Sequence, residues 1–167
     1  DKAISGIYIP EQIEGNSYWV RVRNFERSFY NQTVIDAVRF VSKKDAQKIG
    51  GFDETLFAGE DWDFDKQIRT LGTTASTTAC LFHNENNFSI REYIKKKAYY
   101  APNLDLYRKK WKTDSEVQKQ FSIMYRYIIV FIENGKWKQL VKHIDLAIGM
   151  FALRFLVGLT YLLHKTK

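Results

Sequence analysis

The chain has 167 residues, of which 45% are hydrophobic and 16% aromatic, and this composition supports one packed core and excludes a disordered chain. The net charge of +7 is uneven, with a balance of −3 over residues 1–90 and of +10 over residues 91–167. A basic half beside an acidic half favours an anionic partner, such as phosphates, nucleic acid or membrane headgroups. The lone cysteine, Cys80, excludes a disulfide within the chain, and no signal peptide is expected at the start.

Signals for strands and helices alternate over the first hundred residues, which predicts an α/β fold. In chain order we expect a strand over 3–10, a helix over 18–30 capped near Ser17, a strand over 34–41, a short helix after Ser42, a helix over 60–71, a strand over 73–83 and a basic helix over 90–100. Cys80 falls inside the threonine-rich strand, and its neighbours predict a buried side chain.

The helix expected over 60–71 opens with an unusual density of negative charge. Its run "GEDWDFDKQIRTLG" holds four carboxylates, which belong to Glu60, Asp61, Asp63 and Asp65. The free N–H groups and the dipole of a helix start favour one or two negative charges, but further carboxylates repel one another. Two interpretations stay open: a solvated, well-capped helix start, or a site in which Glu60 or Asp61 meets a proton, a cation or a sugar hydroxyl.

The stretch "IGGFDETLFAGEDWDFDKQIRTLG" resembles the acceptor-side signature of family 2 glycosyltransferases of the GT-A fold. The matching residues are Gly50, Gly51, Phe52, Asp53, Glu54, Glu60, Asp61, Arg69 and Gly72. The likeness covers about residues 34–111 well and the preceding strand and helix loosely. It implies that residues 1–112 form the acceptor-side part of a GT-A (Rossmann-like) catalytic domain and that residues 113–167 form apolar or amphipathic helices that associate with a membrane.

The same resemblance implies roles for the motif residues. Asp61 would be the general base that takes a proton from the acceptor hydroxyl while this oxygen attacks the anomeric carbon of a nucleotide-sugar donor. A single displacement of this kind inverts the sugar. Glu60, Gly51, Phe52 and Trp62 would contact the acceptor, which we expect to be a lipid-linked or cell-surface glycan.

His83 stands at the end of a predicted strand, where α/β folds often place ligands. In related glycosyltransferases a histidine here joins an Asp-x-Asp motif on Mn²⁺ or Mg²⁺, so His83 is a candidate metal ligand as well as an ordinary structural histidine. This chain has no Asp-x-Asp in the matching place. We therefore expect it to be the C-terminal part of a longer enzyme, to lack the donor nucleotide-binding half and to be inactive alone.

A basic, tyrosine-rich segment follows His83. Ser89 and Glu92 have capping-box spacing and predict the start of its helix. The resemblance implies that Lys97, with Tyr99 or Tyr100, closes over the donor diphosphate or the acceptor. The alternatives are a solvated basic face and a nucleic-acid-binding stripe, but the chain has no recognised nucleic-acid motif, so we expect no nucleic-acid partner.

The last third of the chain is strongly apolar. Residues 146–163 would form a helix of about 27 Å, just short of a hydrocarbon core, and Arg154 lies near its middle. Spanning is therefore marginal, and the pattern favours a helix lying in the membrane interface, with Arg154 and the flanking lysines turned toward headgroups. A buried core helix or an oligomer contact is the alternative.

Together these features predict an inverting, metal-dependent glycosyltransferase that acts at the cytoplasmic face of the cell membrane, bound there peripherally or monotopically through residues 121–167. The alternative of another class is a non-catalytic, basic, membrane-peripheral binding module of the same fold.

Overall fold

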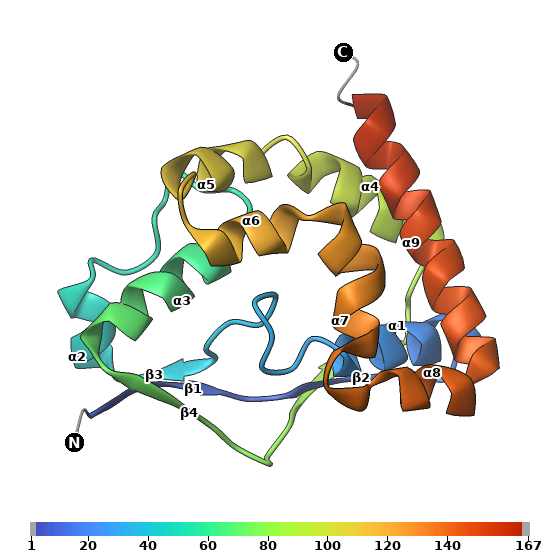
Figure 1. Cartoon of the computed structure of the whole chain (residues 1–167), viewed down its shortest axis with the longest axis horizontal. Coiled ribbons are helices and arrows are strands. Elements are labelled where there is room, and N and C mark those ends of the chain that lie inside the picture. The colour runs from blue at the N-terminus through green and yellow to red at the C-terminus, as the bar shows by residue number, and fades with distance from the viewer. Residues whose placement is uncertain (1–2, 165–167) are drawn as a thin grey trace.

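The computed structural model describes residues 3–164, with side chains as far as Thr160, and it is a mixed α/β fold (Figure 1). In chain order the elements are β1 (Ile4–Tyr8), β2 (Glu11–Glu14), α1 (Tyr18–Ser28), β3 (Phe40–Val41), α2 (Lys43–Lys48), α3 (Glu60–Leu71), β4 (Thr73–Ser76), β5 (Leu81–Asn84), α4 (Ile90–Tyr100), α5 (Leu104–Lys110), α6 (Ser115–Phe121), the π-helical turn η1 (Tyr125–Ile129), α7 (Val130–Ile132), the 3₁₀ turn η2 (Glu133–Gly135), α8 (Trp137–Lys142) and α9 (Ile144–His164). The expected α/β class is confirmed at this level.

Two chain segments that are far apart in sequence run side by side and form four of the strands, and β3 adds a fifth. β1 is the middle strand of the sheet β3-β1-β4, antiparallel to β3 and parallel to β4. Beyond Pro10 the first segment continues as β2, which pairs in parallel with β5 of the second segment. In Figure 1 these strands lie along the lower edge, with α3, α5 and α6 above them.

The strand expected over 73–83 is two strands with a bend between them, and this corrects the prediction for Cys80. The Thr77 hydroxyl accepts a hydrogen bond from the Ala79 N–H (3.1 Å), which closes a local turn and interrupts the strand. Cys80 follows this turn outside both strands, and its side chain is exposed rather than buried.

The strand expected over 34–41 is also wrong in most of its length, because only β3 is a strand and the backbone bonding to β1 begins at Arg39. Carboxylates take the backbone N–H groups that a neighbouring strand would otherwise bind. Asp36 accepts from the N–H groups of Gln32 (2.9 Å) and Ala37 (3.0 Å), and Asp65 accepts from Val38 N–H (3.1 Å). Ile35, Ala37 and Val38 are buried as a loop, which explains why the composition of this segment resembled that of a strand.

The helix boundaries follow the capping signals of the sequence. Ser17, Ser42 and Ser89 each accept a hydrogen bond from a backbone N–H in the first turn of α1, α2 and α4. Gly59 precedes α3 with a φ of +81°, a conformation that favours glycine, and Gly72 follows its last residue. The start of α3 is therefore held by its backbone turn, not by a capping side chain.

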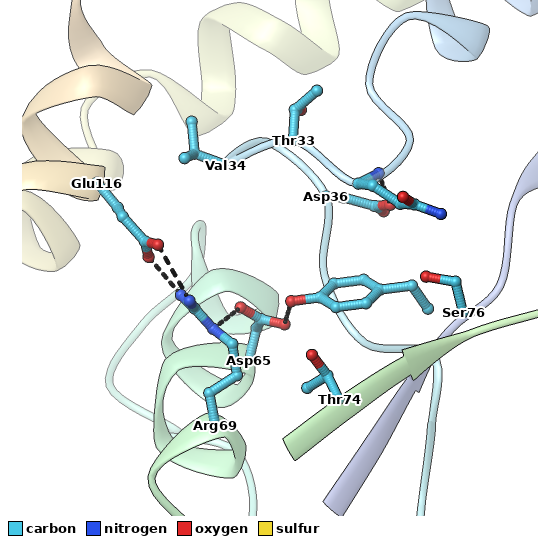
Figure 2. A pocket seen from close by; sticks show the side chains of 10 residues that line it. Thr33, Val34, Asp36, Asp65, Arg69, Thr74, Ser76 and Glu116 are labelled. Carbon is cyan, nitrogen blue, oxygen red and sulfur yellow. Dashed lines mark hydrogen bonds and ion pairs between the residues drawn. The ribbon is translucent and has the colours of Figure 1, made fainter. Parts of the chain in front are cut away.

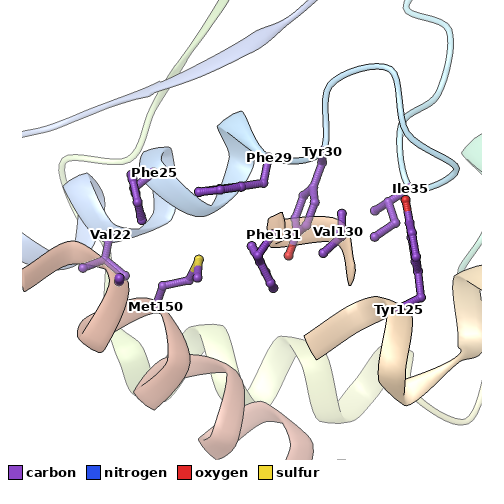
Figure 3. Close-up of a cluster of buried hydrophobic side chains, with 10 residues drawn as sticks. Val22, Phe25, Phe29, Tyr30, Ile35, Tyr125, Val130, Phe131 and Met150 are labelled. Carbon is purple, nitrogen blue, oxygen red and sulfur yellow. The ribbon is translucent and has the colours of Figure 1, made fainter. Parts of the chain in front are cut away.

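The main hydrophobic core joins α1 to the C-terminal helices (Figure 3). Val22 and Phe25 of α1 and Phe29, which follows it, pack against Phe131 and Met150, and Phe29 and Phe131 meet edge to face at 5.1 Å. Each fully buried side chain of this kind contributes about 1.5–3 kcal/mol by leaving water. Residues on both sides of position 112 thus share one core.

α9 has one buried and one exposed face. Gly149 lies so close to α1 that a Cβ there would come within 2.7 Å of Val22 Cγ2, and Met150 and Leu153 are buried on the same side. The opposite side carries an exposed apolar stripe, which we call the α9 stripe: Ile144, Ile148, Phe151, Phe155 and Leu159. The expectation of a core helix thus describes one face, and the expected contact of the other face with a membrane interface stays a prediction.

The expected orientation of Arg154 is wrong. Its side chain is only 11% exposed and forms an ion pair with Glu26 of α1 (2.6 Å) instead of turning toward solvent. Of the lysines expected to flank the helix, Lys142 is exposed, whereas Lys165 and Lys167 lie outside the described residues. Within residues 3–164 no helix is both long enough and apolar enough to cross a bilayer.

Candidate functional site

A large cavity of about 1150 Å³ lies between α1, the start of α3, α4, η1 and α9. Its wall holds six of the predicted site residues, from three separate parts of the sequence: Glu60, Asp61, Trp62, His83, Lys97 and Tyr100. A volume of this size is enough for a ligand that has several chemical groups.

The four carboxylates of α3 divide into two pairs with different surroundings. Glu60 and Asp61 line the large cavity and are partly exposed, and neither forms an ion pair with any residue that the structure describes. One oxygen of Asp61 accepts from the Trp62 backbone N–H (2.9 Å). Glu60 and Asp61 are therefore the members of the cluster that can meet a ligand.

Asp63 and Asp65 point away from the large cavity into protein. Asp63 is fully buried and accepts hydrogen bonds from the Trp111 ring N–H (2.7 Å), the Gln67 amide (2.7 Å) and Lys110 (3.0 Å). These bonds tie α3 to α5 and to the residue that follows it. The charge density of the motif thus has two causes, since one pair holds the fold together and the other faces the cavity.

Asp65 belongs to a second, small cavity of about 300 Å³ (Figure 2). It accepts from the Tyr8 hydroxyl (2.8 Å) and pairs with Arg69 (2.9 Å), which also pairs with Glu116. Burial raises the pKa of Asp65, and burial together with the Asp65 charge raises the pKa of Tyr8. The polar groups of the small cavity thus bind one another, and their presence there is explained by the fold without a ligand.

The basic side of the large cavity is built from α4. Lys97 lies over the Tyr93 ring (5.4 Å), and burial, together with the nearby charges of Arg23 and Arg126, lowers the pKa of Lys97 to about 8. Tyr100 lines the cavity as well, whereas the Tyr99 side chain is 66% exposed and is not part of the wall.

Sequence reasoning assigned no role to Arg126 of η1, yet it also lines this cavity. Its guanidinium lies over the ring of Trp62 (5.6 Å), next in sequence to Asp61. The signal that could have indicated it was a charge inside the apolar run 121–132. An arginine in such a run needs a partner or a cavity when the run packs into the fold.

Gly51 and Phe52, the other predicted acceptor contacts, are not in the cavity wall. Phe52 stacks on Phe64 with ring centroids 4.3 Å apart, and its outer side is exposed. Their contact with an acceptor stays a prediction.

His83 lies on β5, and its exposed side chain reaches the cavity that Asp61 lines. Among the described residues no three His, Cys, Asp or Glu side chains gather in a group that could hold a metal ion. Mn²⁺ and Mg²⁺ need several oxygen ligands, so His83 by itself does not make their site.

Comparisons of the chain with models of protein families, with curated proteins and with solved structures found no match.

Proposed function

We propose that the chain is the acceptor-side part of an inverting glycosyltransferase of the GT-A type. The observation that carries the proposal is that Asp61, at the base position of the sequence motif, lines a large cavity together with Lys97 and His83. A carboxylate without an ion-pair partner suits a general base, and a partly buried lysine in the same cavity suits a group that binds phosphate of the donor or of the acceptor.

The proposed reaction is a single displacement. The acceptor hydroxyl oxygen forms a bond to the anomeric carbon as the bond from this carbon to the donor diphosphate breaks, and the hydroxyl proton passes to an Asp61 oxygen. Asp61 is a weak base toward a free alcohol, but the hydroxyl becomes acidic while its new bond forms. Lys97, with Tyr100 beside it, would stabilise phosphate charge, and His83 stays a predicted ligand for the Mn²⁺ or Mg²⁺ of a complete enzyme.

We expect Asp61→Asn to lower sugar transfer by 10²–10⁴-fold in the full-length protein, the range typical of a lost general base. The measurement is transfer from a panel of nucleotide sugars to membrane-extracted lipid-linked glycans, with circular dichroism to verify the fold. Asp45→Asn, which removes a partly exposed carboxylate in the first turn of α2, is the matched control and should keep its activity. Retention of most activity by Asp61→Asn would exclude the assignment.

Membrane association at the cytoplasmic face is the second part of the proposal, and the α9 stripe supports it. This stripe exposes large apolar side chains, and Lys138 and Lys142 are exposed on α8 and at its end. An apolar face flanked by lysines is typical of helices that lie in a membrane interface. The same features support the alternative function, a non-catalytic membrane-peripheral module, which would bind membranes without transferring sugar.

Ile148→Glu should lower binding of the protein at least tenfold to vesicles made of equal parts phosphatidylglycerol and phosphatidylcholine. The change removes the contribution of about 1.5–3 kcal/mol that the isoleucine side chain would make by leaving water for the membrane. It also adds a negative charge that anionic lipids repel. Sedimentation with vesicles measures it, and Gln118→Glu, which adds the same charge on the exposed surface of α6, is the control. Point changes are needed because deleting residues 121–167 would remove half of the core in Figure 3. Equal binding by Ile148→Glu and the wild type would contradict the proposal.

A further inference from the structure

Four cations in the wall of the large cavity have no carboxylate partner among the described residues. They are Lys96 and Lys97 on α4, Arg108 on α5 and Arg126 on η1. The other arginines of this wall are neutralised, Arg23 by Glu85, Arg27 by Glu11 and Arg154 by Glu26. Glu60, Asp61 and Asp105 in the same wall also form no ion pair with any described residue, so the unpaired cations outnumber the unpaired carboxylates by one.

Aromatic rings hold these cations in place without neutralising them. Lys96 lies over Tyr100 (5.9 Å), and Lys97, Arg108 and Arg126 lie over the rings of Tyr93, Phe121 and Trp62. Lys97 is close enough to Arg126 and to Lys96 to be repelled by each, since burial lowers the pKa of Lys97 to about 8 and the charges of these two residues add to the effect. An anion bound among these three would relieve the repulsion.

The same cavity has apolar side chains that the fold leaves uncovered. Ile123 is 78% exposed, Phe155 is 67% exposed and Leu159 is 42% exposed, and all three belong to the wall. Phe155 and Leu159 also belong to the α9 stripe, so the apolar wall is continuous with the surface that we propose meets the membrane. A free phosphate or a nucleotide would leave these side chains in water, whereas an anion with a hydrocarbon chain would cover them.

We propose that Lys96, Lys97 and Arg126 bind the phosphate of a lipid phosphate whose hydrocarbon chain lies along Ile123, Phe155 and Leu159. This inference rests on the proposed function, since it assigns these groups to the acceptor, a sugar carried on a lipid through phosphate, and not to the donor diphosphate. The sugar hydroxyl would then be presented to Asp61 in the same cavity.

Farnesyl phosphate is a suitable probe, because it is a short lipid phosphate that can be titrated into the purified protein and followed by calorimetry. We expect it to bind at least tenfold more tightly than farnesol, inorganic phosphate or a nucleoside diphosphate. Lys97→Gln and Arg126→Gln should each weaken the binding of farnesyl phosphate at least tenfold. Phe155→Ser should weaken the binding of farnesyl phosphate and leave the binding of inorganic phosphate unchanged.

Two variants guard against a trivial loss of the fold. Lys97→Arg keeps the charge and should keep most of the affinity, and Lys95→Gln removes an exposed lysine of the same helix outside the cavity wall and should have no effect. Equal binding of farnesol and farnesyl phosphate, or unchanged affinity in folded Lys97→Gln and Arg126→Gln, would overturn the inference. Tighter binding of a nucleoside diphosphate that displaces farnesyl phosphate would also overturn it and would assign the cations to the donor.

The outcome is separable from that of the proposed function. Farnesyl phosphate binding as described, with no sugar transfer by the full-length protein, would reject the glycosyltransferase and keep the lipid phosphate site. Asp61-dependent transfer to a water-soluble acceptor, without farnesyl phosphate binding, would keep the glycosyltransferase and reject the lipid phosphate site.

Discussion

Replacing Asp63 by alanine is expected to lower the free energy of unfolding by about 3 kcal/mol, because this fully buried carboxylate accepts hydrogen bonds from three side chains. The Trp111 ring N–H and the Gln67 amide would each lose a charged partner. Lys110 would lose less, because it also pairs with Asp53 (2.7 Å) and is partly exposed. Urea denaturation followed by tryptophan fluorescence measures the change.

Asp61→Ala on the same helix turn is the matched control. Asp61 is partly exposed and accepts from the next backbone N–H, so its loss should cost less than about 1 kcal/mol, the scale of a carboxylate near a helix start. The two substitutions should therefore separate stability from activity, with Asp63→Ala affecting mainly the first and Asp61→Ala the second. Equal destabilisation by both would mean that the acidic cluster acts as one solvated cap.

Local sequence signals were sufficient to predict helices α1 to α4. Ser17, Ser42 and Ser89 cap the helices they were expected to cap, because a serine that precedes an apolar repeat acts within a few residues of itself. The loop over 34–39 could not be predicted in this way, since its conformation depends on Asp65, which is distant in the sequence and takes the N–H of Val38. An apolar composition indicates burial but does not specify which group will satisfy the backbone.

The candidate site was predictable where a motif carried it and not where tertiary packing made it. Glu60, Asp61 and Trp62 were identified from one continuous motif, and all three reach the large cavity. Arg126 is brought to the cavity by the fold of the C-terminal segment, which hydropathy alone described as a membrane element. The error at Arg154 has the same cause. Hydropathy alone predicts that an arginine in an apolar helix extends toward headgroups, because its ion-pair partner, Glu26 of α1, is distant in the sequence.

Arg154→Met should be the most destabilising single substitution considered for this protein, with a loss of about 3–5 kcal/mol in the free energy of unfolding at neutral pH. Arg154 and Glu26 are both nearly buried, and their ion pair (2.6 Å) joins α9 to α1. The Tyr30 hydroxyl also donates to Glu26 (2.5 Å), and Arg154 donates to the Arg126 carbonyl. Removing the guanidinium leaves the Glu26 carboxylate buried without its main counter-charge.

The dependence of this loss on pH follows from the pKa of Glu26. Burial alone would raise this pKa, but Arg154 and the Tyr30 hydroxyl hold it below its usual value, so in the wild type Glu26 contributes stability that is lost as the pH falls through the folded-state pKa. Without Arg154 the pKa of Glu26 should rise above that of the unfolded chain, and stability should then fall as the pH rises. The difference between wild type and Arg154→Met should therefore widen between about pH 4 and pH 7.

The double variant Glu26→Gln/Arg154→Met decides between loss of the ion pair and loss of packing. Replacement of both charges leaves no buried unpaired ion, and the amide introduced on α1 can still bond to Tyr30, so most of the lost stability should return and the difference from wild type should vary less with pH. Urea denaturation of the three proteins at several pH values measures both effects. A double variant as unstable as Arg154→Met, with the same pH profile, would show that the arginine acts through its packing between α1 and α9 and not through its charge.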